Sequence, residues 1–330
     1  MMRSPQQQLP AIVSSVDHLA TPKTVLSEQD LRQALTEQTK KAHLVLHFDI
    51  NETILVGDVA GGDTREDCLN KILAKSAFVH LSSNEDNNIH TCDDNDTRQC
   101  VPTKWWDGTP ICSDSHKDGP PPLYTGWDWP PNTCPYYRTA YKKKAKRFTL
   151  EDGACYRPLY HHMDSLLCHQ DDKESPWNHL LPAFFHTLDT LHSLDVDYTL
   201  ILRTFGSDLK DVAQAISDFS QGKHPLFPDF KDPTLQLDSP EHLYRGRWST
   251  NEKGNPMYTL KNYDSPEIEV ARGDEQVLEV LQGKRHDPTH RILGIQDDYE
   301  TWAANDCNPL FGKPVWISSK EFHHLMLDDN

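Results

Sequence analysis

The sequence has no long apolar run. No hydrophobic stretch approaches the ~18 residues that a membrane-spanning helix needs. The first residues, MMRSPQQQLPAIVSSVDHLATPKT, contain no apolar segment of signal-peptide length. We therefore expect a soluble, cytoplasmic protein with no membrane partner.

Positive charge is scarce: 33 lysines and arginines stand against 50 aspartates and glutamates, which gives a formal net charge of −17. Such a surface repels the phosphate backbone of nucleic acids, which argues against general nucleic-acid binding. The basic run YKKKAKRF (141–148) is the exception. Its residues 142–147 are a nuclear-import signal, a rim of the insertion that attracts phosphate, or a solvated basic face.

The sequence also lacks a CxxC motif, although it contains eight cysteines. Four of them fall in one polar stretch that also contains two histidines. Free thiols in a reducing compartment are the default interpretation of these cysteines. Because their spacing is irregular, a zinc site and two disulfides remain as alternatives. The residues concerned are Cys92, Cys100, Cys112, Cys134, His90 and His116.

A chain of 330 residues is long enough for one large domain with an insertion, or for two domains. Alternation of apolar strands with amphipathic helices predicts an α/β fold with a parallel, doubly wound sheet. No internal repeat is visible. Predicted strands are 43–50, 197–206, 291–299 and 313–318, predicted helices are 27–42, 65–81, 178–195, 207–222 and 273–286, and 243–260 is a hairpin or a strand with a loop.

The pattern changes between residues 56 and 175, where Asp, Asn, Pro, Trp and Tyr replace regular periodicity. We interpret this segment as a loop-rich insertion after the first strand. The predicted organisation is a flexible tail (1–25), a core (26–55 and 176–330) and the insertion (56–175). Tryptophans in the insertion form either its core or an aromatic substrate wall, and they are Trp105, Trp106, Trp127 and Trp129.

Polar residues follow three of the predicted strands. Because the carboxyl ends of parallel strands meet at one edge of a sheet, we expect these residues to lie together. Crowded carboxylates repel one another unless a cation lies between them, and oxygen ligands favour Mg²⁺. Mg²⁺ in turn favours a phosphate substrate, which the head of a helix also attracts. The strand-end residues are Asp49, Asn51, Thr53, Thr204, Gly206, Ser207, Asp297 and Asp298.

In three motifs the chain resembles the haloacid-dehalogenase-like (HAD) superfamily of aspartyl phosphotransferases. HFDINET resembles the first motif, a hydrophobic strand followed by Asp-x-Asp-x-Thr. LILRTFGSD resembles the second, a strand ending in Thr or Ser, and ILGIQDD resembles the fourth, a strand ending in paired acids. A HAD-like Rossmannoid sheet is therefore expected, with the insertion at the place of a C1-type cap.

The resemblance implies a role for each matched residue. Asp49 would be the nucleophile that forms an aspartyl-phosphate. Mg²⁺ would be held by Asp49, Asn51 through its backbone carbonyl, Asp297 and Asp298. Phosphoryl oxygens would be bound by Thr53, Thr204, Phe205 and Gly206. The charge-neutralising lysine would be Lys284, with Lys261 as the competing candidate.

Asn51 departs from the superfamily, because its phosphatases usually carry an aspartate at this place that acts as general acid and base. General acid–base catalysis typically raises the reaction rate by about 10²- to 10⁴-fold. Three interpretations follow. The acid comes from elsewhere (His161, His162 or Glu52); the enzyme tolerates the loss, with slow turnover or a long-lived phosphoaspartate; or the protein binds a phosphorylated ligand without chemistry. We predict a Mg²⁺-dependent phosphatase of a small phosphorylated molecule, a phosphoric monoester hydrolase. The alternatives are a catalytically weak or inactive regulatory protein and a phosphotransferase that uses an acceptor other than water.

Overall fold

The structure is a computed structural model that describes most of the chain in segments. The expected helix 27–42 lies outside the described residues except for Gln33, which is helical. Lys284 and Trp127 also lie outside them. The described residues are Gln33 and the ranges 43–58, 62–81, 101–111, 120–121, 123–124, 129–139, 142–167, 180–237, 240–283, 289–316 and 322–328.

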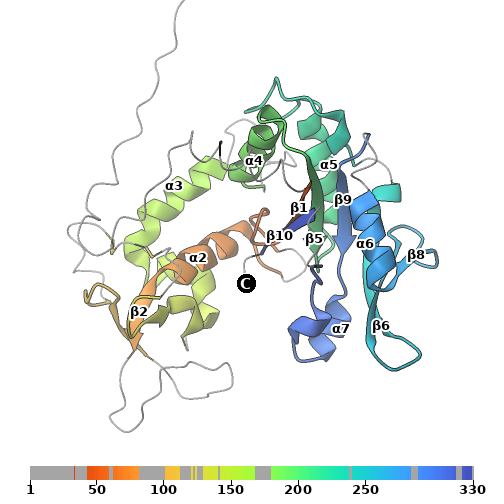
Figure 1. Cartoon of the computed structure of the whole chain (residues 1–330). Helices are drawn as coiled ribbons and strands as arrows, with labels where there is room; N and C mark the ends of the chain where they lie inside the picture. The colour runs from red at the N-terminus through yellow and green to blue at the C-terminus, as the bar shows by residue number, and fades with distance from the viewer. Residues whose placement is uncertain are drawn as a thin grey trace, which may run out of the picture.

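A seven-stranded sheet forms the centre of the fold (Figure 1). Its strands, in spatial order, are β10 (Phe322–Leu327), β1 (His43–Asp49), β5 (Tyr198–Thr204), β9 (Ile292–Gln296), β6 (Leu243–Thr250), β7 (Pro256–Asn262) and β8 (Glu269–Arg272). Strands β10, β1, β5, β9 and β6 pair in parallel. Strands β7 and β8 add antiparallel pairs at the far edge. The sheet is therefore mixed and not wholly parallel.

The antiparallel edge follows from the local sequence. β6 and β7 are joined by a short turn around Asn251 and Gly254, and a short connection permits only an antiparallel pair. Of the two alternatives predicted for 243–260, the structure forms the hairpin. The strands whose ends carry the polar motifs, β1, β5 and β9, lie in the parallel part of the sheet.

Helices cover both faces of the sheet. On one face α4 (Pro182–Ser193) and α5 (Leu209–Ser220) pack their apolar side chains against β1 and β5 in a common core. On the other face α6 (Gly273–Gly283) buries Val277 and Leu281 against Val45, Ile201 and Leu293. The predicted α/β class is confirmed. No helix in the described part of the chain combines the length and the apolar character needed to cross a membrane.

The described part of the insertion has its own hydrophobic core, and in Figure 1 it lies to the left of the large sheet. Its elements are α2 (Arg65–Ser76), α3 (Arg157–Leu167) and a small antiparallel sheet of β3 (Pro102–Trp105), β2 (Phe78–Leu81) and β4 (Cys134–Pro135). The helix predicted over 65–81 ends at Ser76, and its last residues are β2. Residues 142–148 of the basic run lie in Lys142–Leu150, a 3₁₀ stretch that is interrupted by a kink at Arg147.

Trp105 belongs to the core of this insertion. Its ring meets those of Phe148 and Tyr156 edge to face, with centroids 6.1 and 5.5 Å apart, and it is fully buried. Trp129, by contrast, is 47% exposed. Trp105 is therefore part of the core of the insertion and not of an aromatic substrate wall.

The predicted strand at 313–318 is wrong where the structure describes it, because residues 313–316 form no strand. Pro314 has no N–H to donate to a ladder, and its carbonyl accepts a hydrogen bond from Arg203 at 2.9 Å. The strand that pairs with β1 is instead β10, whose residues alternate between half-buried and exposed. This difference places a further acid, Asp328, at the end of a strand beside β1.

Candidate active site

The ends of the parallel strands bring the predicted motifs to one edge of the sheet. In the register of β1 and β5, Asp49 lies opposite Arg203. In the register of β5 and β9, Thr204 lies opposite Gln296. The next residue, Asp297, donates its backbone N–H to the carbonyl of Thr204 at 2.7 Å.

Asp49 is buried and its carboxylate is neutralised by a lysine. Its side chain accepts a hydrogen bond from Thr53 Oγ1 at 3.2 Å and contacts Lys313 Nζ. The same ammonium lies 3.0 Å from Asp328 Oδ2 and 5.0 Å from the centre of the Phe205 ring. Two carboxylates from the ends of neighbouring strands therefore meet at one cation.

Asn51 is the centre of a hydrogen-bonded network. Thr204 Oγ1 donates to Asn51 Oδ1 at 2.8 Å, and the N–H of Gly206 donates to Thr204 Oγ1 at 2.8 Å. The amide nitrogen of Asn51 donates to Asp208 Oδ2 at 3.0 Å. Gln296 Nε2 donates to the carbonyl of Gly206 at 2.8 Å, which joins β9 to the network.

Asp297 has a buried cationic partner within the protein. Arg203 binds both of its oxygens, Nε to Oδ2 at 2.8 Å and Nη2 to Oδ1 at 2.6 Å, and Tyr258 also donates to Oδ1. Burial alone would disfavour the charged guanidinium, but the Asp297 carboxylate outweighs it and raises the pKa of Arg203. The side chains of Arg203 and Asp297 are completely buried.

Asp298 starts helix α7 (Tyr299–Ala304) as its N-cap. Its carboxylate accepts from the N–H of Thr301 at 3.2 Å, from Thr301 Oγ1 at 2.9 Å and from the N–H of Trp248 at 3.0 Å. The bonds from Thr301 are those of a helix cap, and the bond from Trp248 ties the cap to strand β6. In the described part of the chain, Asp49, Asp297 and Asp298 do not form a three-ligand group with all ligand atoms within 4.8 Å of one another.

The lysine beside Asp49 is one that the sequence did not single out. Lys313 lies in FGKPV, beyond the predicted acid motif, and nothing in that stretch marks it. Lys261 lies on β7, opposite Arg245 and Glu269 in the strand register. Arg203 was also missed, although a charged residue within the apolar stretch LILRT is a signal that a buried partner is needed.

The residues suggested as replacements for an acid at position 51 are His161, His162 and Glu52, and their side chains are exposed or form salt bridges. His161 and His162 are exposed on α3. Glu52 lies in the left-handed region, with φ of 60°, and its carboxylate is paired with Lys71 and with Lys75 of helix α2. Glu52 thus links the loop after β1 to the insertion.

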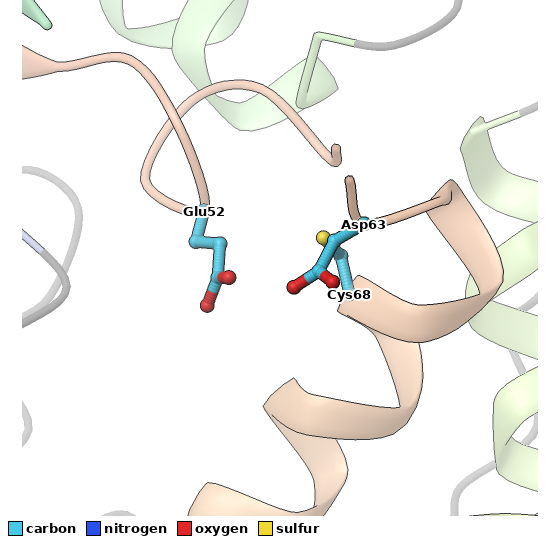
Figure 2. Close-up of side chains that lie close together, drawn as sticks. All are labelled: Glu52, Asp63 and Cys68. Atoms are coloured by element: carbon cyan, nitrogen blue, oxygen red, sulfur yellow. The ribbon is translucent and has the colours of Figure 1, made fainter. Parts of the chain in front are cut away.

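Glu52, Asp63 and Cys68 form a three-ligand group with ligand atoms within 4.8 Å of one another (Figure 2). Lys71 contacts both of its carboxylates, lying 2.6 Å from Asp63, and Lys146 also contacts Asp63. Burial raises the pKa of the Cys68 thiol to about 12, which disfavours the thiolate that a metal would need. The group is a salt-bridge network whose cations are lysines.

A buried histidine, His47, and a half-buried histidine, His324, lie next to the Arg203–Asp297 pair. His47 Nδ1 lies 3.3 Å from Arg203 Nη1, and His47 Nε2 lies 3.1 Å from Nδ1 of His324. Burial, followed by the charge of Arg203, lowers the pKa of His47 to about 2. Burial also lowers the pKa of His324 to about 4. Both imidazoles are therefore neutral in the folded protein at pH 5 to 7.

The lowered pKa of His47 makes the stability of the folded protein depend on pH. Below pH 6.5 the unfolded chain binds a proton at residue 47 that the folded protein does not, so stability is lost as pH falls from 6.5. We expect His47 to account for about 2 kcal/mol of lost unfolding free energy by pH 5. Urea unfolding of wild type and His47→Gln from pH 7.5 to 5 measures the difference. His161→Gln, at an exposed site, is the control, and parallel curves for wild type and His47→Gln would contradict the expectation.

Comparison of the chain with protein-family models, with curated proteins and with solved structures finds no match. The function is therefore inferred from side-chain geometry and from the motif resemblance.

Proposed function

We propose that the protein is a Mg²⁺-dependent phosphatase of a small phosphorylated molecule, with Asp49 as the nucleophile. The observation that carries the proposal is the contact of Lys313 with the buried carboxylate of Asp49 at the end of a central parallel strand. This edge is where α/β sheets bind their ligands. A carboxylate nucleophile beside a cation suits an anionic substrate, whose approach would otherwise be repelled.

The surrounding residues support phosphoryl transfer. Thr53 fixes one oxygen of Asp49, so the other faces Lys313. Thr204 and Gly206 stand where β5 passes into α5, and the N–H groups at the head of a helix favour anions. We propose that Thr53, Thr204, Phe205 and Gly206 line the phosphoryl position, and that Lys313 has the role assigned by resemblance to Lys284.

The strand-end acids fit a magnesium ion in their chemistry. Asp49 and Asp328 lie on either side of the Lys313 ammonium, and carboxylate oxygens are the ligands that Mg²⁺ prefers. We propose that Asp49, Asp328 and the backbone carbonyl of Asn51 hold the ion. Asp297 is a weaker candidate because Arg203 and Tyr258 already bind its carboxylate. When bound, Mg²⁺ would neutralise charge on the phosphoryl oxygens.

The proposed reaction has two steps. An Asp49 oxygen bonds to phosphorus while the bond from phosphorus to the leaving oxygen breaks, and the leaving oxygen takes up a proton. Water then attacks the phosphorus of the acyl phosphate, which releases phosphate and a proton and restores Asp49. Each step is easier than direct attack of water on the ester.

The test is turnover of 4-nitrophenyl phosphate with Mg²⁺. We expect turnover that EDTA abolishes, and a hydroxylamine-sensitive phosphoenzyme that is absent in Asp49→Asn. Loss of the nucleophile should lower kcat by at least about 10⁴-fold. Asp229→Asn is the matched control, because Asp229 is exposed in a turn away from the strand ends.

A specific outcome would reverse the conclusion. Absence of turnover and of phosphoenzyme in the wild type, together with a rise in Tm on adding beryllofluoride and Mg²⁺, would identify a phospho-ligand-binding protein without chemistry. Turnover that persists in Asp49→Asn would remove Asp49 from the reaction.

A further inference from the structure

Three aromatic rings lie together at the carboxyl ends of β5 and β9. The rings of Phe205 and Trp302 are stacked, with their centroids 5.0 Å apart and an angle of 19° between their planes. The ring of Tyr299 meets that of Phe205 edge to face at 5.9 Å and lies 5.9 Å from that of Trp302. Phe205 follows β5, and the other two residues belong to α7, which lies below the ends of β5 and β9 in Figure 1. We call these three residues the aromatic cluster.

The aromatic cluster is partly open to solvent. Tyr299 is 54% exposed, and the side chains of Phe205 and Trp302 are half-buried. Helix α7 buries none of its residues. Exposed rings gain little from the hydrophobic effect unless another group covers them, so a cluster of this kind is typical of a binding surface.

The aromatic cluster is continuous with the proposed site of phosphoryl transfer. Lys313 Nζ lies 5.0 Å from the centre of the Phe205 ring, and the same ammonium contacts the Asp49 carboxylate. A phosphate held beside Asp49 and Lys313 would therefore place its ester substituent next to these rings. A planar substituent gains from offset or edge-to-face packing on aromatic rings, and a saturated ring of the same size lacks this gain.

Asn51 restricts the leaving group. Its amide cannot donate a proton as an acid does, and its two polar atoms are occupied by hydrogen bonds with Asp208 and Thr204. A phenol has a pKa of about 10, so a phenolate can leave without a proton, whereas the far more basic alkoxide needs one. The amide at position 51 and the aromatic cluster are independent observations, and both favour an aromatic leaving group.

We propose that the substrate is a small aryl phosphate, in which an aromatic ring is bonded directly to the ester oxygen. This inference rests on the proposed phosphatase activity and names its substrate class. The ring of the substrate packs on Tyr299 and Phe205, and its phosphate lies beside Asp49 and Lys313. An Asp49 oxygen bonds to phosphorus while the bond from phosphorus to the phenolic oxygen breaks. The electron pair leaves with the phenolate, which then takes a proton from water.

Binding of two phosphonates tests the packing of the ring. Phenylphosphonate and cyclohexylphosphonate carry the same anionic group on rings of similar size, and both have a phosphorus–carbon bond in place of the ester bond. With Mg²⁺ present, we expect the wild type to bind phenylphosphonate about 3- to 10-fold more tightly, as the gain from an aromatic pair predicts. Tyr299→Leu should remove this preference, and Tyr299→Phe should keep it. Isothermal titration calorimetry measures both Kd values.

Ile268→Ala is the matched control for Tyr299→Leu. The Ile268 side chain is also 54% exposed, and it precedes β8 at the far edge of the sheet. This variant should bind the two phosphonates as the wild type does. Equal affinity of the wild type for both phosphonates, or a preference that survives in Tyr299→Leu, would overturn the proposal and leave the phosphatase activity standing.

Turnover of two esters tests the leaving group. Phenyl phosphate and benzyl phosphate both carry an aromatic ring, but only phenyl phosphate releases a phenolate. Without a general acid, kcat/KM for phenyl phosphate should exceed that for benzyl phosphate by at least ~10²-fold. Similar values for the two esters would reveal a proton donor and overturn the substrate class, again without removing the phosphatase activity. A wild type that forms no phosphoenzyme and turns over neither ester would overturn both proposals.

Discussion

Lys313→Met is expected to lower kcat/KM for 4-nitrophenyl phosphate by about 10²- to 10³-fold, the loss that follows removal of one charge-stabilising donor. Two effects combine in this variant. Asp49, the proposed nucleophile, loses the cation beside its carboxylate, and Asp49 and Asp328 lose the ammonium between them. Steady-state kinetics with saturating Mg²⁺ measures the change, and circular dichroism confirms that the variant is folded.

The matched controls are the two lysines that the sequence favoured. Lys261→Met and Lys284→Met remove the same charge from the chain, so the overall electrostatic effect is equal. We expect both to keep kcat/KM close to that of the wild type. If Lys284→Met loses activity while Lys313→Met keeps it, the lysine implied by the motif resemblance acts in the reaction and the role proposed for Lys313 is wrong.

Arg203→Met should have the largest effect on stability. The substitution leaves the carboxylate of Asp297 buried without its cation, and removing one partner of a buried ion pair costs about 3–5 kcal/mol. His47 and Pro314 lose a hydrogen-bond donor as well. Urea denaturation should show a lower midpoint with an unchanged slope.

Arg272 provides a control with the same chemistry in a different environment. It binds both carboxylate oxygens of Glu269 at 2.7 Å, but this pair lies on the surface. Arg272→Met should unfold at nearly the wild-type urea concentration because solvent screens the pair. The double change Arg203→Met with Asp297→Leu should recover much of the loss. Equal midpoints for Arg203→Met and Arg272→Met would contradict the role assigned to burial.

Several elements of the fold could be predicted from periodicity and caps. The strands at 43–50 and 197–206 and the helices at 178–195 and 207–222 correspond to β1, β5, α4 and α5, because each is uniformly apolar or has an apolar stripe. β10 could not be predicted in this way. Its sequence FHHLML contains two histidines, and its alternation is visible only once its pairing with β1 is known.

The site was predictable where residues follow a strand directly. Asp49, Thr204 and Asp297 come to one edge because parallel strands share a direction. Lys313, Asp328 and Asp208 were not predictable as partners. Their contacts depend on the order of strands in the sheet and on loop paths, neither of which leaves a local pattern in the sequence.

The contact between Asp49 and Lys313 joins residues that are 264 positions apart. During synthesis, β1 emerges early and then waits for both of its neighbours, since β5 and β10 come much later in the chain. Pairings of such long range are slow to form, and unpaired strands favour aggregation. A nascent chain that ends before β5 therefore carries β1 without either of its partner strands, so chaperone protection should matter most in that interval.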